Sequence, residues 1–132
     1  MKEIIKVVYS TLKRETLVEL DNSLNPKTVQ AILENLPITV NINRWGDELY
    51  TDKTLIGVGE ENSTKLVELF NVAFWPPGQA MCFFYGPNPI SLPGKILAYS
   101  PVNVVGKILP YENEKSEIME KICDDVKVII RK

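Results

Sequence analysis

Two short segments of the chain carry most of the side chains that could act on a ligand. The first segment contains Arg44 and Trp45, followed by Glu48 and Tyr50. An arginine beside a tryptophan can present a guanidinium and a flat apolar face to a peptide carbonyl or a small anion. An exposed ion pair between Arg44 and either Asp47 or Glu48 accounts for the same residues without any ligand. The sequence alone supports both interpretations.

The second segment begins with Trp75-Pro76-Pro77-Gly78, a rigid turn because proline fixes φ and glycine permits a sharp reversal. Such a turn beside a large aromatic ring suits a ligand wall, and it equally suits a barrel corner. On the strand that follows, the face with Ala80 and Cys82 suits a tight interior. We therefore expect the opposite face, with Gln79 and Phe83, to line a groove. Phe83 also fits a buried core position.

The most informative count in the composition is that of histidine, which is zero. Its absence excludes Ser-His-Asp and Cys-His nucleophile systems and zinc sites with histidine ligands. The two cysteines, Cys82 and Cys123, are too few for a structural zinc site, and we expect both to be free, buried thiols. We expect no metal and no cofactor.

The composition is that of a single globular domain spanning residues 1–132. Hydrophobic residues make up 45% and charged residues 24%, and the net charge is −2. This balance provides no basic surface for nucleic acid or for an anionic membrane. No apolar run approaches the roughly 18 residues that a membrane span requires. We expect a cytoplasmic protein with no nucleic-acid or membrane partner.

Short apolar runs separated by proline and glycine predict many short strands and few helices. Asn25 and Pro26 are expected to cap and open a helix that ends before Pro37, and a second helix is expected over residues 114–122. Residues 87–101 read as a loop, and Gly106 reads as a bend within a strand. We expect strands over residues 4–9, 16–20, 38–42, 48–50, 55–58, 66–69, 72–75, 80–85, 102–109 and 126–130. Because helices do not alternate with strands, a barrel or sandwich is predicted, and a barrel leaves no exposed edges.

Three stretches resemble a family of small bacterial and archaeal cyclophilin-like proteins of unknown function. They read NRWGDELY from Asn43, FWPPGQAMCFFYGP from Phe74 and SPVNVVGKI from Ser100. The resemblance covers nearly the whole chain, and the Trp-Pro-Pro-Gly stretch is its most specific part. It implies a mainly β fold, a closed eight-stranded cyclophilin-like β-barrel with two short helices at its ends.

A more distant resemblance links the chain to the true cyclophilins, which are peptidyl-prolyl isomerases. Residues 102–108 are similar to their strand ending in Phe-Gly-Lys-Val, and residues 78–84 to their Gly-Ser-Gln-Phe-Phe strand. Arg44 occupies a place comparable to that of their catalytic arginine, although no Phe-His precedes it. The resemblance implies an isomerase in which Arg44 donates to the prolyl nitrogen.

These observations lead to one main functional hypothesis and two alternatives. The main hypothesis is a domain that binds a peptide or small molecule in a groove near Trp75. The alternatives are a prolyl isomerase that uses Arg44 and an aromatic pocket, and an assembly subunit that uses apolar residues 74–90 as an interface, with a homo-oligomer as one form. The expected ligand-binding residues are Trp45, Glu48, Tyr50, Trp75, Gln79 and Phe83.

Overall fold

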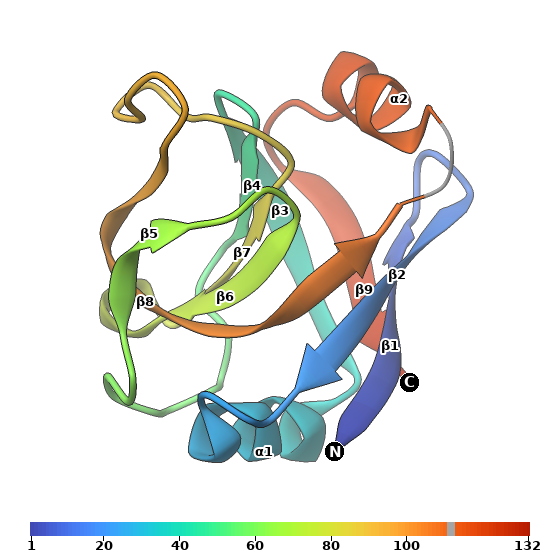
Figure 1. Ribbon diagram of the computed structural model, residues 1–132. Coiled ribbons are helices and arrows are strands. Elements are labelled where there is room, and N and C mark those ends of the chain that lie inside the picture. The colour runs from blue at the N-terminus through green and yellow to red at the C-terminus, as the bar shows by residue number, and fades with distance from the viewer. Residues whose placement is uncertain (111–112) are drawn as a thin grey trace.

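The computed structural model describes residues 1–110 and 113–132, which form nine strands and two α-helices (Figure 1). The helices are α1 (Pro26–Asn35) and α2 (Glu114–Lys121), and a single 3-10 turn spans Pro76–Gly78. The strands are β1 (Lys2–Tyr9), β2 (Arg14–Asp21), β3 (Ile38–Trp45), β4 (Glu48–Thr51), β5 (Thr64–Val67), β6 (Asn71–Trp75), β7 (Ala80–Phe84), β8 (Ile96–Leu109) and β9 (Val126–Arg131).

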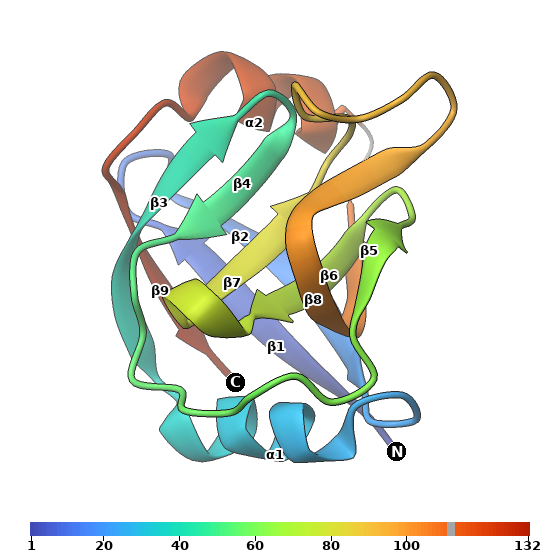
Figure 2. The same cartoon turned by 90° about the vertical axis from the view of Figure 1, so that its left-hand side faces the viewer.

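Eight of the strands close into an antiparallel barrel, as the sequence predicted. Their order is β2-β1-β9-β3-β4-β7-β6-β8, and β8 returns to pair with β2. The ninth strand, β5, pairs only with β8 and lies outside the closed ring. Figures 1 and 2 show α1 below one end of the barrel and α2 above the other end.

Alternating side chains fill the barrel, because successive residues of a strand point to opposite faces. In β1, Ile5, Val7 and Tyr9 are buried inside while the residues between them are more exposed. The last strand, β9, shows the same alternation, which confirms the half-exposed strand expected there. Buried residues from all eight barrel strands and both helices belong to one continuous core.

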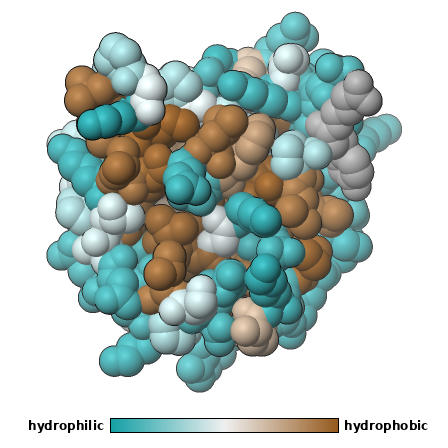
Figure 3. Space-filling view, viewed as in Figure 1, coloured by the Kyte–Doolittle hydropathy of each residue, from teal (hydrophilic) through white to brown (hydrophobic). Residues whose placement is uncertain are grey.

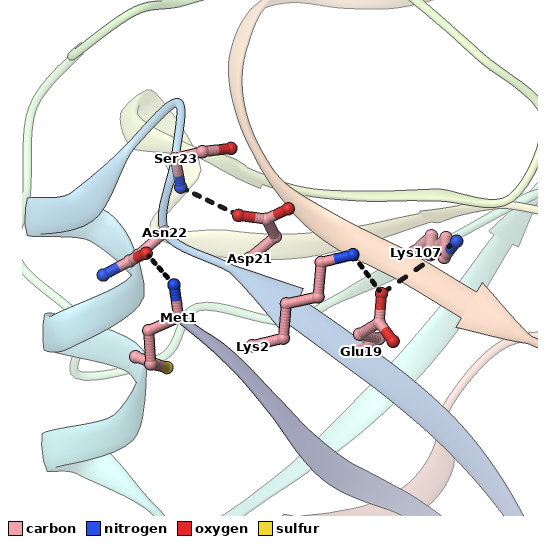
Figure 4. A network of polar contacts seen from close by, with 7 residues as sticks. All are labelled: Met1, Lys2, Glu19, Asp21, Asn22, Ser23 and Lys107. Carbon is pink, nitrogen blue, oxygen red and sulfur yellow. Dashed lines mark hydrogen bonds and ion pairs between the residues drawn. The ribbon is translucent and has the colours of Figure 1, made fainter.

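The barrel closes where β2 meets both β1 and β8. Glu19 on β2 lies between Lys2 and Lys107, with N–O distances of 3.7 and 3.9 Å (Figure 4). Gly106 on β8 lies so close to β2 that a Cβ atom there would be 2.1 Å from the Glu19 carbonyl oxygen. The pairing of β8 with β6 shifts register beside Gly106, so this glycine sits at the expected irregularity.

The start of α1 differs in detail from the expectation. Pro26 opens the helix as predicted, but the side chain of Asn25 does not cap it. That side chain donates instead to the Val104 carbonyl at 2.7 Å. The carboxylate of Glu61 accepts hydrogen bonds from the backbone N–H groups of Lys27 and Thr28, at 3.2 Å each. The cap therefore comes from a distant loop, where a negative charge favours the helix N-terminus.

Three further expectations are wrong. Residues 55–58 are not a strand, because the Ile56 N–H contacts the Thr54 hydroxyl and its carbonyl accepts from the Gln79 side chain. β8 begins at Ile96, inside the expected loop, because its first half pairs with β5. Cys123 is exposed rather than buried, while both cysteines are free as expected.

Apolar side chains also gather on the outside of the barrel, over β5 and the neighbouring strands (Figure 3). Three large side chains from β5, from the turn after it and from β8 are each at least 49% exposed: Leu66, Leu69 and Tyr99. No helix in the described residues is long and apolar enough to cross a membrane.

Candidate functional site

A pocket of about 430 Å³ lies on the outer face of the barrel wall. Its position follows from the strand alternation, because Leu49, Met81 and Phe83 fill the barrel and their neighbours point outward. In Figure 2 the β3–β4 hairpin lies on one side of β7, and the first half of β8 passes in front of β6 on the other side. The lining residues are Trp45, Glu48, Tyr50, Trp75, Cys82, Ala98, Tyr99 and Val102.

Three aromatic rings from three strands meet at this pocket. The ring of Tyr99 is 6.2 Å from that of Trp45 and 5.9 Å from that of Trp75, measured between centroids. The interplanar angles are 68° and 89°, so Tyr99 stands edge-on between the two indoles. Such edge-to-face contacts favour a fixed arrangement of the rings. Tyr99 is 66% exposed, which places it at the mouth.

The Trp75–Gly78 turn fixes one of these walls. A Cβ atom on Gly78 would lie 2.4 and 2.6 Å from two carbons of the Trp75 ring, so only glycine lets the indole rest against the turn. The Trp75 Nε1–H donates to the Ser100 hydroxyl at 2.6 Å. Ser100 and Tyr99 lie in the part of β8 where its register with β5 shifts. That irregularity carries both residues to the pocket.

Among the residues that the structure describes, Glu48 is the one carboxylic acid that lines the pocket. It is only 5% exposed, and the side-chain amide of Asn88 donates to its Oε1 atom at 2.8 Å. Burial raises the pKa of Glu48 to about 7, because a charged carboxylate loses hydration there. Hydrogen bonds from Asn88 and Cys82 favour the charged form and lower the pKa in part. Glu48 therefore changes charge near neutral pH.

The loop after β7 positions Asn88. The Asp47 N–H donates to the Pro87 carbonyl at 2.9 Å, which holds the β3–β4 turn against this loop. Gly46 has φ +63°, and a Cβ atom there would lie 2.8 Å from the Asn88 Cα. The Asn88 amide also donates to the Leu97 carbonyl at 2.6 Å. Asn88 thus joins β4 to β8 across the pocket.

Cys82 lies beside Glu48 with its thiol buried. Burial is the main cause that raises the pKa of this thiol well above its ordinary value, and the nearby Glu48 carboxyl is a second, smaller cause. A nucleophilic cysteine requires the opposite shift, because the thiolate is the reactive form. Cys82 therefore serves as an apolar wall and a weak hydrogen-bond donor.

Comparison with known proteins supplies the family. The family model for cyclophilin-like proteins matches residues 3–131 of this chain. The chain belongs to the cyclophilin-like family. A hypothetical protein from Archaeoglobus fulgidus, known from its solution structure, is 39% identical to this cyclophilin-like chain. The match covers 99% of this chain and 93% of that one, with a TM-score of 0.76.

The cyclophilin-like chain also resembles McbB, whose structure was determined in complex with tryptophan. The identity is 17% and the TM-score is 0.75, so this likeness shows the fold alone. The match covers 97% of this chain but only 44% of McbB. No curated protein matches the cyclophilin-like chain.

The pocket of this cyclophilin-like chain contains four of the residues that the sequence singled out. Trp45, Glu48, Tyr50 and Trp75 come from three strands and share one outward face. Arg44 points away from them. Its guanidinium donates to the Gly46 carbonyl at 2.7 Å and to the Met119 carbonyl of α2.

The ion pair expected for Arg44 is present, since one guanidinium nitrogen lies 3.4 Å from an Asp47 carboxylate oxygen. These contacts tie the β3–β4 turn to α2. An isomerase mechanism that uses Arg44 in this pocket therefore has no support in the geometry. The alternative interpretation, in which Arg44 forms an ion pair with Asp47, describes the contacts of this side chain.

Two other expected site residues lie outside the pocket. Phe83 is 1% exposed and belongs to the barrel core. Gln79 adopts φ 50°, and its side chain donates to the Ile56 carbonyl at 2.9 Å. The two faces of β7 are thus reversed from the prediction, and Cys82 faces the pocket. Side-chain size does not decide the faces, since Phe83 belongs to the barrel core while Cys82 and the equally large Phe84 pack in a smaller cluster outside it.

Sequence reasoning missed the contributions of Cys82, Ala98, Tyr99, Val102 and Asn88. Four of these line the pocket, and Asn88 holds its acid. A signal existed in the short run Ile96-Leu97-Ala98-Tyr99, which is apolar and aromatic enough for a strand. The prolines on either side of this run concealed it.

Proposed function

We propose that this cyclophilin-like domain binds a small organic ligand in the outer pocket. The observation that carries the proposal is the meeting of Trp45, Trp75 and Tyr99 beside the buried carboxyl of Glu48. Ligand sites are usually apolar clefts with a few placed polar groups, and they span about 300–1,000 Å³. The volume of about 430 Å³ lies in that range.

A small ligand is favoured over an extended peptide strand. A peptide that adds to a sheet needs a free strand edge. The strands β4, β6 and β7 each pair on both sides, so their own backbone groups are already hydrogen-bonded. The first half of β8 pairs only with β5. Side chains therefore provide the recognition, and the aromatic walls suit a ring or another flat apolar group.

The experiment is a calorimetric titration with small aromatic compounds. Phenethyl alcohol and indole are suitable neutral probes, and tryptophan is a further probe because McbB was captured with it. We expect saturable binding that weakens at least about tenfold in Trp75→Ala, since one wall is lost. Leu55→Ala is the control, because Leu55 is apolar but 90% exposed and is not among the lining residues. Equal affinity in both variants would overturn the proposal.

A further inference from the structure

The described residues that line the pocket include an acid but no basic side chain. Glu48 is its buried acid, and no lysine or arginine is among the described residues that line it. Arg44, the nearest basic residue along the chain, is held on the opposite side by Gly46, Asp47 and Met119. An anionic ligand would meet an unpaired carboxyl in a poorly hydrated place, which is costly.

The aromatic walls add a second preference of the same sign. A cation within about 6 Å of an aromatic ring is attracted to the ring face. Trp75 and Tyr99 stand almost perpendicular, at 89°, with centroids 5.9 Å apart. Two rings at such an angle form a corner in which one cation can contact both. Trp45 adds a third ring on the far side of Tyr99.

We infer that the ligand of this pocket is a small organic amine whose cationic nitrogen lies between the aromatic rings and the Glu48 carboxylate. This inference rests on the proposed function and specifies the chemistry of the ligand. It also accounts for Asn88, whose amide donates to the Oε1 atom of Glu48 and so orients the carboxyl. The positive charge of the bound amine offsets the free-energy cost of keeping the buried Glu48 carboxylate ionised.

Binding of a cation should release a proton from Glu48. The titratable groups that face Glu48 are Tyr50 on its own strand, Cys82 on β7 and Tyr99 on β8. Burial raises the pKa values of both Tyr50 and Cys82, so these groups stay neutral. Asp52 and Asp124 act on Tyr50 and do not line the pocket. Glu48 is the facing group whose raised pKa, about 7, lies near neutral pH.

Three matched compounds test the inference on the intact chain. Phenethylamine is a cation, phenethyl alcohol is its neutral counterpart and hydrocinnamate is an anion of similar shape. We expect phenethylamine to bind at least about tenfold more tightly than the alcohol at about pH 8, with hydrocinnamate weakest. Its affinity should fall about tenfold by about pH 6, as Glu48 takes up a proton. Phenyltrimethylammonium shows whether a quaternary nitrogen serves as well as a primary one.

Two variants separate the role of Glu48 from that of the fold. In Glu48→Gln the preference for the cation should fall at least about fivefold, to the part that the aromatic rings provide, and the pH dependence should vanish. Glu60→Gln is the matched control, because Glu60 is exposed and its carboxylate accepts from the Ser63 hydroxyl at 2.8 Å, outside the pocket. Unfolding curves establish that both variants are folded.

The possible results are distinct. Equal binding of amine and alcohol, stronger binding of hydrocinnamate, or an amine preference that is undiminished in Glu48→Gln would each overturn the inference. The proposed function would still stand if the bound compounds lose affinity in Trp75→Ala. Failure of every compound to bind would overturn both.

Discussion

Glu48 makes the stability of this domain depend on pH. Its pKa is raised from 4.5 to about 7 in the fold, so the native state holds a proton that the unfolded chain releases. Stability should therefore fall as pH rises from about 4.5 to about 7, by as much as about 3 kcal/mol. We expect Glu48→Gln to remove this loss and to be more stable than the wild type above about pH 7.

The measurement is urea unfolding of both proteins at several pH values, read as the difference in free energy of unfolding. Subtracting the two curves cancels the other carboxyl groups. Glu60→Gln, at an exposed site, is the control for the removal of one carboxyl group. A constant difference for Glu48→Gln would show that folding does not shift the pKa of this acid, against the account.

Arg44 is expected to matter for structure and not for binding. Its guanidinium joins the β3–β4 turn to α2 through the Gly46 and Met119 carbonyls. Arg44→Ala should lower the free energy of unfolding by about 1–2 kcal/mol, since hydrogen bonds from a charged group are lost. Ligand affinity should change less than about twofold. Calorimetry measures the affinity and thermal unfolding measures the stability. A large loss of affinity would show that Arg44 takes part in ligand binding, against the prediction.

At the residue scale, the sequence identified the aromatic and acidic types that matter. Trp45, Glu48, Tyr50 and Trp75 were predicted from type and spacing, and the structure brings them together. The charge state of Glu48 could not be predicted, because it depends on burial beneath β8 and on Asn88, forty residues away. The pKa of a buried acid depends on long-range packing, which the local sequence does not predict.

The Trp75–Gly78 turn positions an aromatic wall, and one methyl group should disturb it. A Cβ atom on Gly78 would overlap the Trp75 ring, with the nearest carbon at 2.4 Å. In Gly78→Ala the indole must move, so its hydrogen bond to Ser100 weakens and ligand affinity should fall about tenfold or more. The emission maximum of tryptophan fluorescence should shift as well.

Gly57→Ala is the matched control for this prediction. A Cβ atom on Gly57 would meet no atom within 4 Å, and the change is the same single methyl group. Affinity and fluorescence should stay as in the wild type. If Gly78→Ala behaves like Gly57→Ala, the turn is not what holds Trp75 in place.

At the element scale, strands with clear alternation were predicted well, and the errors lie where the chain makes unusual pairings. β8 was expected to begin at residue 102, because Pro101 normally interrupts a strand. In the structure Pro101 lies within β8, in the irregular stretch between the Leu97–Leu66 and Val102–Thr64 pairs. The proline is tolerated there because the ladder is already broken.

Closure of the whole barrel depends on a close approach that only glycine permits. A Cβ atom on Gly106 would lie 2.1 Å from the Glu19 carbonyl oxygen and 3.0 Å from the Leu20 Cα, both of which are backbone atoms. In Gly106→Ala the backbone of β2 or β8 must shift, which should cost about 1–3 kcal/mol or more. Gly59→Ala is the control, because nothing lies within 4 Å of its Cβ position.

Denaturant unfolding of the two variants measures this effect. Gly59→Ala should differ from the wild type by less than about 1 kcal/mol. Hydrogen exchange should show the loss in Gly106→Ala spread over β1, β2 and β8, the strands joined at the closure. Equal stability of the two variants would contradict a strained closure at Gly106.

For the molecule as a whole, the closed barrel with two helices followed from the strand pattern together with the family resemblance. The register that closes it did not, because pairing of β2 with β8 joins residues about ninety positions apart. The position of the site was partly predictable. Its placement outside the barrel depends on β8 folding back over β6 and β7, which no local pattern specifies.

The most direct test of the central claim is a titration with phenethylamine followed in the ¹H–¹⁵N spectrum. The chain has two tryptophans, and both line the pocket, so both indole N–H signals report on it. We predict that both signals shift saturably, together with the amide signals of Ala98 and Tyr99. Shifts gathered at the barrel closure around Glu19 or at α2, with unchanged indole signals, would contradict the account.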